Sequence, residues 1–128
     1  MTETHTPVKV VLVGHCRPDQ FMLKSAIESL VPGATVESVS DSDTLRAASG
    51  DADLLLVNRV LDGVFDDAGG IDLIERVAAG GARAMLISNL PDALAESETR
   101  GGVPGFGKSE LRSERMRERL LAALGRDE

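Results

Sequence analysis

Two short segments of the chain are apolar at almost every position. They are VKVVLVG at residues 8–14 and DLLLVN at residues 53–58. A strand buried on both faces of a parallel sheet has this continuous pattern, whereas a strand with one solvent face alternates between apolar and polar positions. The pattern therefore predicts two central strands of a parallel sheet.

Three further short strands and five helices are predicted around these two. Apolar residues at helical spacing lie between the strands, and Gly or Pro residues close most of the helical stretches. Ser109 is the expected N-cap of the last helix. The additional strands are expected over 34–39, 83–88 and 102–106, and the helices over 18–31, 44–50, 71–79, 91–102 and 109–125.

Strand and helix alternate five times, which predicts a three-layer α/β sandwich with right-handed crossovers. We expect one domain over 8–125, with a disordered arm over 1–7 and a short tail over 126–128. Ligands of such folds bind beyond the carboxyl ends of the strands. The residues expected to meet there are Gly14, His15, Cys16, Asn58, Ser88, Asn89, Gly107 and Lys108.

Amino-acid composition limits the classes of partner that the protein is expected to bind. The net charge is −7, and the only aromatic residues are three Phe, so binding to nucleic acid is not expected. No apolar run approaches the roughly 20 residues of a membrane helix. The first residues, MTETHTP, lack the basic and apolar regions of a secretion signal, so a cytoplasmic protein is expected.

Three segments together resemble the motifs of response-regulator receiver domains. They are DLLLVNRVLDG at 53–63, MLISN at 85–89 and GVPGFGKSEL at 102–111. The resemblance covers nearly the whole chain, from Val8 to Leu124. It implies a flavodoxin-like, doubly wound (βα)5 sandwich with a five-stranded parallel sheet in the order 2-1-3-4-5.

The same resemblance implies roles for four residues. Lys108 falls on the lysine of the family's phosphorylation pocket, and Phe106 on its switch aromatic residue. Ser88 falls on the Ser or Thr that contacts the phosphoryl group, and Asn58 on the aspartate that receives it. Phe106 is also a natural core residue, and Ser88 a common polar residue at a strand end.

The acidic residues of that pocket are missing. A carboxamide has no anionic oxygen to attack phosphorus, and His15 and Cys16 stand where receivers place the acidic pair that binds Mg²⁺, which prefers oxygen ligands. The sequence thus resembles a degenerate receiver, or pseudo-receiver, without enzymatic activity, cofactor or metal. Lys108 is expected to bond Asn58 or a backbone carbonyl, or to extend into solvent.

His15 and Cys16 suggest two further chemistries. Two candidate ligands fall short of the four of a structural zinc site. A nucleophilic cysteine needs an oriented base, and neighbours on an extended chain point in opposite directions. A single cysteine also excludes an internal disulfide.

Surface charge is the remaining candidate for function. Helix 91–102 carries acidic residues, and the last helix carries arginines at spacings of three and four that would share one face. Receivers frequently pair through their fourth helix, fifth strand and fifth helix, so a homodimer through this face is one expectation and an ordinary solvated surface is the other. The residues are Asp92, Glu96, Glu98, Arg112, Arg115 and Arg119.

The main hypothesis is a phosphorylation-independent interaction module of bacterial signal transduction, which binds another signalling protein or itself. The alternative is a small-molecule or thiol-redox sensor that uses the altered pocket. An enzyme of flavodoxin-like fold ranks last, because the sequence has neither a phosphate-cradling loop nor a paired acid and base.

Overall fold

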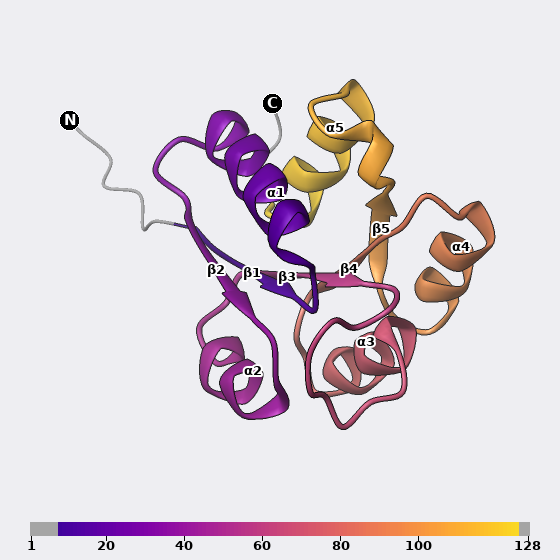
Figure 1. Ribbon diagram of the computed structural model, residues 1–128. Helices are drawn as coiled ribbons and strands as arrows, with labels where there is room; N and C mark the ends of the chain where they lie inside the picture. Colours follow the sequence, from indigo (N-terminus) through magenta and orange to yellow (C-terminus); the bar gives the residue numbers. More distant parts are fainter. Residues whose placement is uncertain (1–7, 126–128) are drawn as a thin grey trace.

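The structure is a computed structural model that describes residues 8–125, and five parallel strands form its central layer (Figure 1). The arm and the tail expected at the two ends lie outside the described residues. The elements, in chain order, are β1 Lys9–Val13, α1 Arg17–Leu30, β2 Thr35–Val39, α2 Ser42–Ser49, β3 Leu54–Asn58, α3 Gly70–Ala79, β4 Ala84–Ile87, α4 Pro91–Thr99, β5 Val103–Phe106, a 3₁₀ turn at Lys108–Glu110, and α5 Glu114–Ala123.

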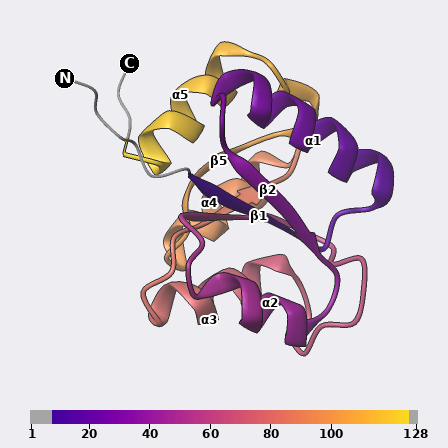
Figure 2. The same ribbon diagram turned by 90° about the vertical axis from the view of Figure 1, so that its left-hand side faces the viewer.

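The strands lie in the order β2-β1-β3-β4-β5, and every neighbouring pair is parallel. Helices α1 and α5 cover one face of the sheet and α2 and α3 the other, which gives three layers (Figure 2). The flavodoxin-like (βα)5 fold and its strand order, both expected from the sequence, are confirmed.

Two apolar layers explain why the central strands are apolar throughout. Val10 and Leu12 of β1 pack with α1 and α5, while Val11 and Val13 pack with α2 and α3. All four side chains have no exposed surface. Because successive side chains of a strand point to opposite faces of the sheet, a strand between two helical layers is apolar at both its odd and its even positions.

The start of the last helix differs from the sequence-based prediction. Residues 108–110 form a 3₁₀ turn, Arg112 has a left-handed backbone with φ of 67°, and α5 begins only at Glu114. The N-cap is Ser113, whose hydroxyl accepts a hydrogen bond from the Met116 amide at 3.2 Å. The prediction of a helix from Ser109 was therefore wrong, and Arg112 does not lie on the helix with Arg115 and Arg119.

No helix within residues 8–125 is both long and apolar enough to cross a membrane.

Candidate functional site

The carboxyl ends of β1, β3, β4 and β5 meet at one edge of the sheet, as the topology requires. Val13 of β1 lies opposite Val57 of β3, and Asn58 lies opposite Ile87 of β4. His15, Asn58 and Ser88 therefore follow neighbouring strands at this edge, and Lys108 follows β5. The hydrogen bonds of these side chains, however, do not form a single shared pocket.

Asn58 acts as a hydrogen-bond donor toward two backbone oxygens. Its Nδ2 atom donates to the Gly14 carbonyl at 3.0 Å and to the Val60 carbonyl at 2.7 Å. The first bond ties the end of β3 to the end of β1, and the second turns the following loop back onto the strand. A carboxylate at this position has no proton to donate and would face two carbonyl oxygens. The amide that ends the apolar strand therefore has a structural role.

The loop between β3 and α3 lies over the ends of β1 and β2. The Asp62 amide donates to the Gly14 carbonyl at 2.9 Å, and the Val64 amide donates to the Ser40 carbonyl at 2.8 Å. Gly63, with φ of 135°, allows this approach, because a Cβ atom there would lie 2.1 Å from the Ser40 oxygen. The loop thus covers the strand ends beside His15.

His15 is a buried residue, with 2% of its surface exposed. Its Nε2 atom lies 2.9 Å from the Leu56 carbonyl, to which it donates a hydrogen bond. Burial lowers the pKa of His15 to about 4, the Leu56 bond opposes this shift, and the nearby Lys108 charge adds to it. The imidazole is therefore neutral at pH 7.

Lys108 forms an ion pair that the sequence analysis did not identify. Its Nζ atom lies 2.7 Å from Oδ2 of Asp19, in the first turn of α1. The bond to Lys108 lowers the pKa of Asp19, and a hydrogen bond with Cys16 acts in the same direction. The expectation that Lys108 bonds Asn58, a backbone carbonyl or solvent was wrong, because the chain supplies a carboxylate from another element.

Asp19 lies three residues after Cys16, so it matches no ligand position of the receiver motif. The signal that could have identified it is its place in the first turn of a helix, where acidic side chains are favoured and where α1 approaches the strand ends. Asn89 was also missed as a structural residue. Its Oδ1 atom accepts hydrogen bonds from the backbone amide and the hydroxyl of Ser109, at 3.0 and 3.1 Å.

Ser88, Phe106 and Cys16 have local roles in the structure. The Ser88 hydroxyl accepts a hydrogen bond from the Leu90 amide at 3.1 Å, and its side chain is almost fully buried. Phe106 has no exposed surface and belongs to the core under α1 and α5. Cys16 is half-buried at the N-cap position of α1.

These donors do not fit the Mg²⁺ ion that receiver domains bind. The positions after β1 offer a buried imidazole and a thiol, and the amide nitrogen of Asn58 already donates to two carbonyls. Mg²⁺ requires oxygen ligands in near-octahedral geometry. Within residues 8–125, no group of three or more His, Cys, Asp or Glu side chains is placed to hold a metal ion.

Structural comparison identifies the fold class. The chain is similar to the signal receiver domain of a DNA-binding response regulator (merR) from Colwellia psychrerythraea 34H, with a TM-score of 0.74, 14% identity, and coverage of 93% of this chain and 99% of that one. It is also similar to a response regulator from Thermotoga maritima, with a TM-score of 0.72, 20% identity, and coverage of 94% and 99%.

A third similar structure is NtrX from Brucella abortus, with a TM-score of 0.74 and 16% identity; the match covers 94% of this chain and 27% of NtrX. No protein-family model matches the sequence, and a search of curated proteins finds no significant match. The chain thus has the fold of response-regulator receiver domains, at low sequence identity.

Replacing Asn58 with aspartate should destabilise the protein, because the carboxylate loses both donated bonds and faces two carbonyl oxygens. We expect N58D to lower the free energy of unfolding by about 2 kcal/mol at neutral pH, measured by urea denaturation. The matched control is N89D, since position 89 only accepts hydrogen bonds and a carboxylate oxygen can accept them too. Equal stability of the two variants would contradict the donor role of Asn58.

Burial of neutral His15 should make stability depend on pH. The unfolded chain takes up a proton near pH 6.5 but the folded protein only near pH 4, so the free energy of unfolding should fall as the pH is lowered across this window. The loss attributable to His15 should reach about 3 kcal/mol. Urea denaturation of the wild type and of H15Q at several pH values measures this loss. If the free energy of unfolding falls equally with pH in both proteins, His15 does not cause the dependence.

Proposed function

We propose that this protein is a phosphorylation-independent, receiver-like interaction module of bacterial signal transduction, acting in the cytoplasm. The observation that carries the proposal is the donor role of Asn58 at the position corresponding to the phosphorylated aspartate of receivers. The similar structures are receivers and response regulators, which favours a signalling role, and the chemistry at the strand ends argues against phosphotransfer.

Each group that phosphotransfer needs has another role in this chain. The position of the nucleophile holds an amide that bonds backbone, and the lysine pairs with Asp19 at 2.7 Å. A phosphoryl group that bonds Lys108 would have to compete with Asp19 for it. This competition opposes binding of a phosphoryl group before any reaction can take place, and it supports the proposal of a protein without catalytic activity.

The surface formed by α4, β5 and α5 is the proposed binding face. A groove of about 590 Å³ runs along it, with an apolar base that includes Val103, Pro104 and Ala122. Glu98 and Glu118 line it together with Arg83 and Arg119. Apolar contact area among charges of both signs suits a protein partner, which is another signalling protein or a second copy of this chain.

Several charges of this face already have partners within the chain. Arg119 donates to the Gly105 carbonyl at 2.8 Å, and Arg115 lies 3.3 Å from a carboxylate oxygen of Glu110. Glu96 pairs with Arg100 at 2.9 Å. The face therefore does not present a uniformly acidic helix opposite a uniformly basic one, and we assign recognition to the groove.

The alternative, a thiol or small-molecule sensor, has one observation in its favour. Cys16 is half-buried at the N-cap position of α1 and contributes to the lowered pKa of Asp19, so a modified thiol would disturb the Asp19–Lys108 ion pair. Thiol-labelling rates and a thermal-shift screen distinguish the two functions. Slow labelling without any ligand-induced shift favours the interaction module.

The protein should not accept a phosphoryl group. Incubation with Mg²⁺ and acetyl phosphate should leave its intact mass unchanged, because no carboxylate occupies position 58 and no oxygen ligands assemble after β1. N58D should behave in the same way, since it restores the nucleophile without the metal site. A receiver with its acidic residues intact serves as the positive control. A mass gain of one phosphoryl group on the wild type would refute the proposal.

Blocking the groove should abolish association. Ala122 is exposed at the groove, so A122R should lower the molar mass that light scattering gives for a self-associating wild type, or prevent the immobilised protein from retaining a partner that the wild type retains, without a change in stability. The matched control is A47R, the same exposed change on α2 at the opposite face of the sheet. If A122R and A47R both associate as strongly as the wild-type protein does, this face is not the binding face.

A further inference from the structure

All five large apolar side chains that the described residues leave exposed belong to segments at one end of the molecule, where the strands end. Two are on the second turn of α1, two are in the loop between β3 and α3, and one follows β4: Phe21, Met22, Val60, Val64 and Leu90, with exposed fractions of 49–79%. Figure 2 shows the start of α1 and the loop after β3 at the same, right-hand end of the sheet. Exposed apolar side chains gathered in this way mark an interaction surface, which is called the carboxyl-end surface below.

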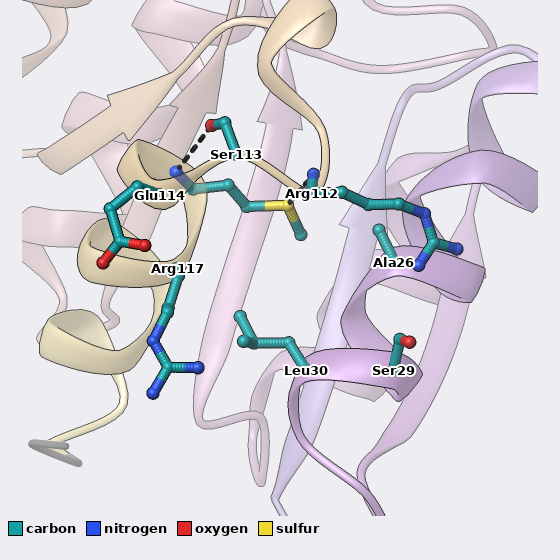
Figure 3. A pocket seen from close by; sticks show the side chains of 8 residues that line it. Ala26, Ser29, Leu30, Arg112, Ser113, Glu114 and Arg117 are labelled. Carbon is teal, nitrogen blue, oxygen red and sulfur yellow. Dashed lines mark hydrogen bonds between the residues drawn. The ribbon is translucent and has the colours of Figure 1, made fainter.

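The α1 half of this surface carries positive charge. Arg17 begins α1 and is exposed. Arg112 reaches from the segment before α5 to α1, where Nη2 donates to the Ser25 hydroxyl at 2.9 Å (Figure 3). Ser25 lies one helical turn after Phe21 and Met22, so this guanidinium stands beside both side chains. In the described part of the chain, no carboxylate pairs with either arginine.

The loop half of the surface carries negative charge. Asp62, Asp66 and Asp92 are exposed, and none of their carboxylates forms an ion pair with another described residue. Arg59 is exposed beside them, so three carboxylates stand against one guanidinium. Arg59, Leu90 and Asp92 also line a hollow of about 330 Å³. The loop half therefore combines exposed apolar side chains, a hollow and an excess of acid.

The two halves adjoin at the end of β1. The Asp62 amide donates to the Gly14 carbonyl at 2.9 Å, and Arg17 follows Gly14 by three residues. Each half thus offers exposed apolar area with the charge that the other half would attract. An anionic membrane or a nucleic acid would attract only the α1 half and would be repelled by the loop half.

A second copy of the chain satisfies both halves at once. In one molecule the halves lie next to each other and do not face each other. In a two-fold dimer the same surface of both copies is used, so the basic half of each copy can face the acidic half of the other. Such a contact closes on itself, and association stops at two chains.

We propose that two copies of this chain associate about a two-fold axis through the carboxyl-end surface, with the α1 half of each copy against the loop half of the other. Phe21, which is 74% exposed, then packs beside Leu90 at the hollow of the other copy. Aromatic side chains that fill a pocket are typical anchors of an interface. The groove along α4, β5 and α5 stays free in this dimer, and the inference does not rest on the proposed function.

Light scattering at low salt, over a range of protein concentrations, tests the association. We expect the molar mass to rise from that of one chain and to level off at that of two, with a dissociation constant of about 10 μM. The A122R variant, which blocks the groove, should give the same curve, and this separates the carboxyl-end dimer from association through the groove. Added NaCl should weaken the dimer, since exposed charges contribute to it.

Reversal of charge in one half supplies the decisive comparison. R17E/R112E makes both halves acidic, and D62R/D66R makes both halves basic. Each variant alone should associate at least about tenfold more weakly than the wild type, a difference of about 1.4 kcal/mol. An equimolar mixture of the two variants should reach the molar mass of two chains, because each half then faces its opposite. F21S should weaken the wild-type dimer by a similar factor.

Thermal unfolding should show every variant folded, because the replaced side chains are exposed. The dimer is refuted if the wild type keeps the molar mass of one chain, if A122R loses the association, or if either charge-reversed variant associates as strongly as the wild type. A mixture that stays at the mass of one chain would also refute it. An F21S variant as strongly associated as the wild type would refute the packing of Phe21 at the hollow.

Discussion

The two hydrogen bonds donated by the Asn58 amide determine the architecture of the sheet edge. One joins β3 to the residue that follows β1, and the other turns the chain back toward the sheet. From that turn the loop runs over the ends of β1 and β2, where Gly63 fits against Ser40. A single side-chain amide therefore holds the end of β3, the end of β1 and the start of the following loop together.

Several charged side chains are also held by partners within the chain. Two arginines are held by acidic neighbours: Arg76 of α3 pairs with Asp67, and Arg100, which follows α4, contacts carboxylates on α3 and α4 at 2.8–2.9 Å. Exposed pairs of this kind contribute little stability each. Their effect is to neutralise part of the acidic surface around α3 and α4.

The sequence predicts the fold well because burial on two faces leaves a direct trace in residue type. Val10 to Val13 and Leu54 to Val57 are apolar at both parities only because helices cover both sides of the sheet. The residue types at the strand ends, among them His15, Cys16 and Asn58, can be read from the sequence as directly once the strands are located.

The start of α5 and the partner of Lys108 cannot be read from residue types in the same way. Ser109 and Ser113 are equally good N-caps by residue type, and the choice depends on the left-handed conformation of Arg112, which side-chain chemistry does not favour. The partner of Lys108 comes from an element distant in sequence. Its identity depends on how the start of α1 lies over the sheet, which periodicity does not specify.

The ion pair between Asp19 and Lys108 joins positions 89 residues apart. It can form only after β5 has docked beside β4, because that docking brings the segment after β5 to the edge of the sheet. The pair thus links the first turn of α1 to the segment after β5, and its geometry requires that β5 lie beside β4.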